Sequence, residues 1–373
     1  MSDLLYSEIE NDLRAGVREL LDDKAPWTAV LAGTEKDEPY DAALWRAVAG
    51  QLGCAGLPVP EDLGGAGATW RETAVVMEEL GRAVAPVPFL ASSVIATAAL
   101  LEAGERELLG SLAAGERVAV LAVPFATPPG EVAPTVRAAD GTLTGEIAGV
   151  ADGLAADVLL VPAADGLYAV DAADAARTAV TSLDMTRRLA DIALSGAPAR
   201  RVAEGGDAVR AALLTGAAML ASEQLGLAQR CLDDTVAYVK NRYQFGRPVG
   251  SYQGLKHRLA DLWTSITQAR AVARYAASCA AHQAVAGGPG GSSPQKERAD
   301  ADLPVAVAVA QAHCSAVALK AAEECVQMHG GIGFTWENSS HLFLKRAKAD
   351  SIALGTADRH RAALAALVDL PSA

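Results

Sequence analysis

The stretch that decides the fold is RYQFGRPVGSYQ, residues 242–253. Apolar residues recur at helical spacing before it, in residues 207–241, and again after it, from residue 252 to about 286. Gly246 and Pro248 interrupt the pattern and turn the chain. Because so short a connection leaves the two helices side by side and antiparallel, the sequence predicts a helical bundle with this loop at one end.

The side chains of this loop suit a nucleotide. Arg242 carries a fixed charge for a phosphate, Gln244 and Gln253 offer amides for a sugar or base, and Phe245 offers a flat ring for stacking. A plain helical hairpin whose arginine caps helix carbonyls explains the loop slightly better when the loop is taken alone. The loop alone therefore leaves both interpretations open.

Two further motifs bear on that choice. QMHGGIGFTWE, residues 327–337, ends a later helix with glycines that let backbone N–H groups approach a pyrophosphate closely. AKADSIALGT follows at residues 347–356. With residues 242–253, these motifs resemble the acyl-CoA dehydrogenase family, whose C-terminal bundle carries R-x-x-F-G-x-P and then Gln, Q-x-x-G-G-x-G, and A-K-x-x-x-I-x-E-G-T.

The resemblance implies a mainly α protein with a small β-domain. Its parts are an N-terminal helical domain at residues 1–115, a barrel-like β-domain at 116–203 and a C-terminal four-helix bundle at 204–373. The sequence itself shows helical spacing in the first part and short β-type runs in the second, at residues 118–123, 158–161, 167–170 and 178–180. A flexible connection is predicted at Gly287–Pro294, and the third long helix from about Asp302 to Met328, with Pro304 in its first turn.

Composition narrows the classes of function. A net charge of −13 and a pI near 5.0 argue against nucleic acid and anionic membranes as partners. The five cysteines have no C-x-x-C spacing, which predicts buried free thiols, and no metal site is expected. The N-terminus lacks the features of a signal peptide, and no apolar run demands a membrane span, so we expect a cytoplasmic protein.

The resemblance also implies a cofactor, a substrate and partners. The cofactor is FAD, the substrate an acyl-CoA thioester, and the electron acceptor an electron-transfer flavoprotein. A homo- or heterotetramer is expected, in which the ADP part of FAD binds across a subunit interface. The residues expected to hold the cofactor are Arg242, Gln244, Phe245, Gln253, Gln327, Gly330, Gly331, Thr356 and Asp358.

The groups that hold the flavin ring in the family are missing. Where the family has T-E-P-x-x-G-S-D after the first strand, this chain reads VPFATPPGE at residues 123–131. Where the family has W-I-T-N/S, it reads IAGVADG at residues 147–153, without a tryptophan or a hydroxyl. The segment DMTRR at residues 184–188 offers a hydroxyl and two charges, and we expect it to be structural.

The catalytic base is missing as well. Dehydrogenation needs a carboxylate of raised pKa to take the α-proton, and a hydrogen bond to the thioester carbonyl as enolate charge develops. The family's E-G-T glutamate falls on Leu354, whose backbone N–H is expected to remain for the carbonyl, and the alternative glutamate of some members falls on Gly216. Glu223 lies about 10 Å further along the same helix and Asp358 at a cofactor position, so each is expected to be solvated or to face the cofactor.

His257, His329 and His360 are expected at helix ends or loops, as capping or cofactor-edge residues. The base therefore stays unassigned. Retained ADP motifs without a base resemble the companion subunit of heteromeric acyl-CoA dehydrogenases, which completes the FAD site of a related catalytic chain. The alternatives are a self-sufficient homotetramer with an unusual base, and a non-catalytic acyl-CoA-binding or scaffold protein.

Overall fold

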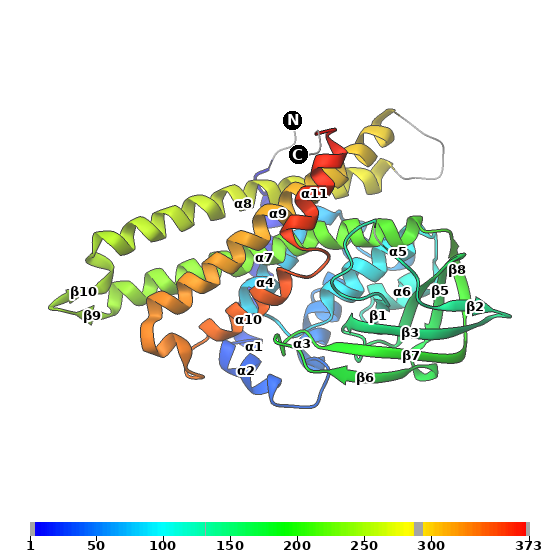
Figure 1. The fold of residues 1–373 in the computed structure, drawn as a ribbon, viewed down its shortest axis with the longest axis horizontal. Helices are drawn as coiled ribbons and strands as arrows, with labels where there is room; N and C mark the ends of the chain where they lie inside the picture. The colour runs from blue at the N-terminus through cyan, green and yellow to red at the C-terminus, as the bar shows by residue number, and fades with distance from the viewer. Residues whose placement is uncertain (1–3, 131, 287–293, 371–373) are drawn as a thin grey trace.

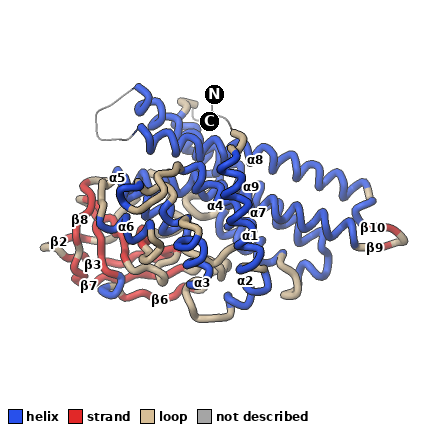
Figure 2. The backbone as a smooth tube through the Cα atoms, turned by 180° about the vertical axis from the view of Figure 1, so that it is seen from behind, coloured by secondary structure: helices blue, strands red, loops and turns tan. Residues whose placement is uncertain are grey.

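Three long helices run side by side through the molecule, and the other elements pack around them (Figure 1). They are α7 (Asp207–Asn241), α8 (Gln253–Ala286) and α9 (Pro294–His329). The computed structural model describes residues 4–130, 132–286 and 294–370. Most strands gather at one end of the molecule, a short two-stranded hairpin lies at the opposite end, and helices make up the rest (Figure 2). The prediction of a mainly α protein with a small β-domain is confirmed.

The connection from α7 to α8 is a β-hairpin. Strands β9 (Tyr243–Gln244) and β10 (Arg247–Pro248) pair antiparallel across a two-residue turn. Both turn residues have left-handed backbones, with φ of +52° at Phe245 and +77° at Gly246. That conformation matches the twist of the two strands, and it projects the Phe245 ring, which is 92% exposed. The predicted reversal of the chain is confirmed, and its hairpin form is an addition.

Helix α9 begins earlier than predicted. It starts at Pro294 rather than near Asp302, so Pro304 lies inside the helix. A proline there removes one backbone hydrogen bond. Helix α9 packs along both α7 and α8, and this packing holds the helix together through Pro304. Most of the predicted flexible connection, residues 287–293, lies outside the described residues.

The N-terminal helices cover one side of the bundle. They are α1 (Glu8–Lys24), α2 (Trp27–Thr34), α3 (Ala42–Trp45) with a π-helical extension to Gln51, α4 (Trp70–Ala83), a π-helical segment (Leu90–Ala96) leading into α5 (Thr97–Glu102), and α6 (Glu107–Ala113). Ser7 and Thr69 cap α1 and α4 with reciprocal capping boxes.

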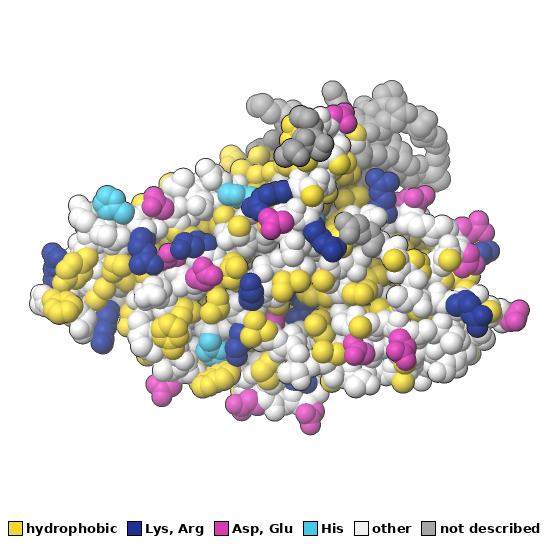
Figure 3. Space-filling view, in the orientation of Figure 1, with side chains coloured by type: hydrophobic (Ala, Val, Ile, Leu, Met, Phe, Trp, Pro, Cys, Tyr) yellow, Lys and Arg dark blue, Asp and Glu magenta, His cyan; other side chains and the backbone are white. Residues whose placement is uncertain are grey.

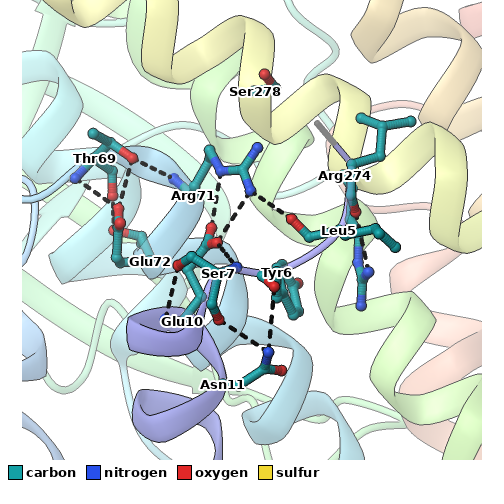
Figure 4. A network of polar contacts seen from close by, with 12 residues as sticks. Leu5, Tyr6, Ser7, Glu10, Asn11, Thr69, Arg71, Glu72, Arg274 and Ser278 are labelled. Carbon is teal, nitrogen blue, oxygen red and sulfur yellow. Dashed lines mark hydrogen bonds and ion pairs between the residues drawn. The ribbon is translucent and has the colours of Figure 1, made fainter. Parts of the chain in front are cut away.

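A polar seam attaches the segment before α1 to α4 and α8 (Figure 4). The Tyr6 ring lies between the guanidinium carbons of Arg14 and Arg274, 4.3 and 3.7 Å from its centroid. Arg71 donates to Glu10 at 2.8 Å and to the Leu5 carbonyl at 3.1 Å. Helices from distant parts of the sequence are thereby held in one arrangement.

Helices α4 and α7 touch backbone to backbone through two glycines. A Cβ atom added at Gly226 would lie 1.7 Å from the Glu78 carbonyl oxygen, and one added at Gly81 would lie 2.1 Å from the Glu223 carbonyl oxygen. Only glycine allows so close a crossing. The crossing fixes the position of the part of α7 that carries Glu223.

The β-domain consists of two four-stranded sheets, ordered β1-β4-β5-β8 and β2-β3-β7-β6. A parallel bridge between Val136 and Ala163 joins them. The predicted β-type runs are confirmed at four strands, and the other four were not predicted because Ala, Gly, Arg and Ser weaken their apolar alternation. The strands are β1 (Ala119–Leu121), β2 (Arg137–Ala139), β3 (Thr142–Ala151), β4 (Val158–Ala163), β5 (Gly166–Asp171), β6 (Ala176–Val180), β7 (Leu189–Pro198) and β8 (Arg200–Glu204).

Among the residues that the structure describes, two helical stretches are long and apolar enough to cross a membrane by length and composition, Asp207–Asn241 and Ala301–Phe334. Of their most apolar windows, 94% and 61% are buried inside the protein. Burial against the other helices explains their apolar character. The five cysteines are free and buried, as predicted.

Candidate functional site

The two expected base positions meet in the folded chain. Leu354 lies in the turn between α10 (Ser340–Asp350) and α11 (Ala357–Leu367), with φ of +52°. A Cβ atom added at Gly216 on α7 would lie 3.3 Å from the Leu354 side chain and 2.7 Å from that of Ile95. Leu354 is 1% exposed. The place where a carboxylate would take a proton is therefore filled by apolar side chains.

The backbone N–H of Leu354 is already engaged. It donates to the Phe125 carbonyl at 2.7 Å, while the Phe125 N–H donates to the Gly149 carbonyl at 2.9 Å. A Cβ atom added at Gly355 would lie 2.8 Å from the Pro128 side chain. Residues 123–130, which we call the plug loop, press against the turn. The expectation that this N–H remains for a thioester carbonyl is wrong in this conformation.

His360 supports the same turn. Its Nε2 lies 2.9 Å from the Leu354 carbonyl oxygen, an acceptor, so this nitrogen carries the proton. Burial lowers the pKa of His360 and keeps the ring neutral. The ring holds the turn as a hydrogen-bond donor. Asp358 points away, with a side chain 91% exposed and paired with Arg361 at 2.7 Å.

Glu223 lies in a buried ionic cluster. It is 2% exposed and accepts hydrogen bonds from Arg187 at 2.9 and 2.7 Å and from Arg346 at 2.8 Å. Burial alone would raise the pKa of Glu223, but the two guanidinium groups outweigh it and lower the pKa to about 2. The expectation of a solvated or cofactor-facing carboxylate is wrong. Glu223 is ionised, and the charges of the two arginines balance its own. A carboxylate of such low pKa does not suit a general base.

The cluster joins the β-domain to the bundle and reaches the plug loop. Arg346 pairs with Asp184 and donates to Thr186 at 2.7 Å, and Arg187 donates to Asp350 at 3.0 Å. The Arg187 guanidinium carbon also lies 5.5 Å from the centroid of the Phe125 ring. Residues 184–188 are structural, as expected, but the cluster itself was not predicted. Its signal in the sequence is a lone glutamate in an apolar helical run.

Asp152 completes the cluster and is expected to make the protein less stable as pH rises. It is 5% exposed, and its Oδ2 has no hydrogen-bond partner among the described residues. Burial, opposed mainly by Arg187 and Arg346, raises its pKa from 3.8 to about 6. A carboxyl whose folded pKa is raised contributes stability below its unfolded pKa and loses it as pH rises through the folded value.

Asp152→Asn should therefore raise the free energy of unfolding at pH 8 by up to about 3 kcal/mol, and remove the loss of stability that the parent shows between about pH 4 and 6. Asparagine also tolerates the φ of +54° at this position. Urea unfolding from pH 4 to 8 measures both effects. Asp140→Asn is the matched control, because Asp140 has φ of +48° and is exposed. Equal slopes for Asp152→Asn and the parent would refute this assignment.

One group of predicted cofactor residues gathers at the hairpin end of the bundle. The rings of Tyr238, near the end of α7, and His329, at the end of α9, stack with centroids 4.3 Å apart. This contact places the loop that carries Arg242 beside the turn that carries Gly330 and Gly331. The side chains of Arg242, Gln244, Phe245, Gln253 and Gln327 are exposed there, as are both glycines.

A second group lies elsewhere on the chain. Thr356 caps α11, accepting from the Arg359 N–H at 3.4 Å, and Asp358 lies in its first turn. Arg361 on α11 donates to the Ala312 carbonyl on α9 at 3.4 Å. Ala312 precedes His329 by 17 residues, which is about 25 Å along a helix. The nine predicted residues therefore form two separate groups rather than one pocket.

A crevice of about 440 Å³ opens beside the second group. Leu214 and Val307 line it, and Arg210 and Arg359 also contribute to its walls. Pro128 and His360 form part of the wall, and a Cβ atom added at Gly355 would lie 2.8 and 3.1 Å from their side chains. The plug loop thus stands between this crevice and the Leu354 turn.

Comparison with known proteins identifies the family. Residues 7–116 match the family model for the acyl-CoA dehydrogenase N-terminal domain, and residues 203–368 match that for the C-terminal domain. The chain belongs to the acyl-CoA dehydrogenase family. Acyl-CoA dehydrogenase IpdE2 of Mycolicibacterium smegmatis is 37% identical over 349 residues, which are 94% of this chain and 95% of that protein. Members of this family are FAD-dependent oxidoreductases that act on acyl-CoA thioesters.

Two solved structures extend the comparison. A chain of the ChsE4–ChsE5 complex from Mycobacterium tuberculosis has a TM-score of 0.86 at 26% identity, and the alignment covers 100% of both chains. A chain of the Tcur3481–Tcur3483 steroid ACAD has a TM-score of 0.82 at 29% identity, covering 97% of this chain and 98% of that one. The predicted acyl-CoA dehydrogenase fold and oxidoreductase class are confirmed.

Proposed function

We propose that this acyl-CoA dehydrogenase chain is the companion subunit of a heteromeric enzyme. It completes the FAD site of a related chain that supplies the catalytic base. The observation that carries the proposal is the Leu354 turn, where a leucine stands at the base position and its N–H donates to Phe125 at 2.7 Å. The chain's own site therefore has neither a base for the α-proton nor a free Leu354 N–H for the thioester carbonyl.

The flavin-ring half of this chain's own site does not fit the ring. Bound FAD supplies the acceptor for the hydride that leaves the β-carbon. In residues 147–153, backbone groups already bond to other parts of this chain. The Gly149 N–H donates to Asp191 at 2.8 Å, and the Gly149 carbonyl accepts from the Phe125 N–H. The chain therefore offers the isoalloxazine neither the family's side chains nor these backbone groups.

The hairpin end does fit the ADP half of the cofactor. Arg242 offers a guanidinium for the diphosphate, and the exposed Gly330–Gly331 turn has no Cβ atoms and so lets the cofactor approach its backbone closely. We propose that Arg242, Gln244, Phe245, Gln253, Gln327, Gly330 and Gly331 contact an FAD whose flavin lies in the partner chain. Thr356 and Asp358 would contact a cofactor on this chain's own side of the interface.

The wider assignment follows from the same proposal. The substrate is an acyl-CoA, and a steroid acyl-CoA is the first to assay because the similar Tcur3481–Tcur3483 protein is a steroid ACAD. We propose an electron-transfer flavoprotein as the electron acceptor, a cytoplasmic location, and domains at residues 1–115, 116–203 and 204–373. The buried ion pairs of Glu223 and the exposure of Asp358 favour this proposal over a self-sufficient enzyme.

Arg242→Ala tests whether the hairpin end holds the cofactor. In the complex with the base-bearing chain, its loss should weaken FAD binding about 10- to 100-fold, since hydrogen bonds to charged groups contribute about 1.5–3 kcal/mol. Flavin content after dialysis, with the affinity from titration of the stripped complex, measures this. Arg106→Ala is the control, because Arg106 is 64% exposed and pairs with Asp62. Unchanged FAD affinity in Arg242→Ala would contradict the proposed site.

A further inference from the structure

A solvent-facing tryptophan follows the glycine turn at the hairpin end of the bundle. Trp336 is 63% exposed, and Phe334, two residues earlier, is 74% exposed. Hydrophobic side chains show at this end of the molecule in the space-filling view, at the left of Figure 3. Large aromatic side chains are usually buried to a high degree, so an exposed pair beside Gly330 and Gly331 calls for an explanation.

Neighbouring side chains fix the indole ring in place. The Lys345 ammonium lies 4.3 Å from its ring centroid, in a cation–π contact, and the His341 ring packs against it with centroids 4.6 Å apart at 67°. Both neighbours lie on α10, which begins just after the turn. Trp336 is thus oriented by two contacts, yet it keeps most of its surface in solvent.

The surroundings supply the other parts of a nucleotide site. The exposed Gly330–Gly331 turn has no Cβ atoms and so lets a diphosphate approach its backbone closely, Lys345 adds a positive charge beside the ring, and the Tyr238–His329 stack brings the Arg242 loop to the same end. An aromatic face held near phosphate donors is suited to stack on a purine.

We infer that Trp336 stacks on the adenine ring of the dinucleotide, with Lys345 as the residue that positions the indole. This rests on the proposed function, in which this end of the chain binds the ADP half of FAD. It adds Trp336 as a base-stacking residue to a site in which Phe245 also offers a ring. Trp336 lies near the end of the stretch 327–337, beyond the Q-x-x-G-G-x-G pattern that ends at Gly333, and Lys345 lies outside all three motifs.

The first test is the affinity of the heteromeric complex for FAD. Trp336→Ala should weaken FAD binding about tenfold or more, and Trp336→Phe should restore most of it, because the loss of a stacked base contact is large and a smaller ring still stacks. Trp263→Ala is the matched control, since Trp263 on α8 is 58% exposed. Thermal unfolding checks that each variant is folded.

The outcomes separate the inference from the proposed function. If Trp336→Ala binds FAD as the parent does while Arg242→Ala loses it, the stacking inference is wrong and the cofactor site stands. If both variants bind FAD as the parent does, the cofactor site at this end is wrong, and the inference falls with it.

The second test is tryptophan emission of the full chain titrated with ADP, which does not absorb where tryptophan emits. ADP should lower the tryptophan emission of the parent and of Trp263→Phe, and leave the emission of Trp336→Phe unchanged. Equal quenching in Trp336→Phe would overturn the inference. A blue shift of Trp336 emission on adding the partner chain, with no effect of ADP and no loss of FAD affinity in Trp336→Ala, would also overturn it and identify the ring as a protein contact.

Discussion

Replacing Glu223 with glutamine is expected to lower the free energy of unfolding at pH 7 by about 3–5 kcal/mol, the usual result of removing one partner from a buried ion pair. The loss is large because Glu223 accepts hydrogen bonds from both Arg187 and Arg346, which are 6% and 2% exposed. The variant leaves two buried guanidinium groups with less negative charge than they need.

The effect should depend on pH with a definite sign. A carboxylate whose folded pKa is lowered contributes stability above its unfolded pKa and loses it as pH falls toward the folded value. The pKa of Glu223 falls from 4.5 to about 2, so the difference between parent and variant should shrink as pH drops through that window. Urea unfolding from pH 2 to 8 measures it.

Asp358→Asn is the control for Glu223→Gln, because the Asp358 side chain is 91% exposed and its removal should barely change stability. Glu223→Gln also tests whether Glu223 is the catalytic base. In the heteromeric complex, turnover per folded molecule should be similar for parent and Glu223→Gln. A normally stable Glu223→Gln whose dehydrogenation is abolished would identify Glu223 as the base and contradict the companion role.

Gly226→Ala is expected to cost at least about 2 kcal/mol net. The added Cβ would lie 1.7 Å from the carbonyl oxygen and 2.7 Å from the carbonyl carbon of Glu78. Those are backbone atoms, so a change of rotamer gives no relief and helices α4 and α7 must separate. Overpacking typically costs 1–3 kcal/mol and sometimes more, and it outweighs the gain of about 1 kcal/mol that alanine brings to a helix.

Gly16→Ala on α1 isolates the helix-propensity part of that result. A Cβ at Gly16 meets nothing within 4 Å, so this variant should be more stable by about 0.5–1 kcal/mol. Thermal or urea unfolding of the two variants beside the parent gives the comparison. Gly226→Ala as stable as Gly16→Ala would show that α4 and α7 do not cross at this glycine.

The bundle and the hairpin end were predictable because their signals are local. Helical periodicity on either side of residues 242–253 sets the antiparallel pair, and Gly246 sets the turn. The second sheet was harder to predict, since strands such as β7 are held by pairing with β3 and β6 rather than by a strong apolar pattern of their own. The motifs likewise predicted the family, which the comparisons confirm.

The Leu354 turn was predictable only in part. Leu354 at the base position is visible in the sequence, but the Phe125 carbonyl that takes its N–H comes from a loop far away along the chain. Glu223 meets Arg187 and Arg346, which are 36 and 123 positions away. Contacts of that kind depend on how the β-domain packs against the bundle. The spacing of residues in the sequence does not predict that packing.

The most direct test of the companion role is the visible absorption spectrum during anaerobic addition of acyl-CoA. It compares the lone chain, supplied with FAD, with the chain co-expressed beside a related chain that carries the glutamate base. The companion role predicts that flavin absorbance is bleached in the co-expressed complex and unchanged in the lone chain. Bleaching of the lone chain would contradict it and would mean that this protein is a complete dehydrogenase with a base of its own.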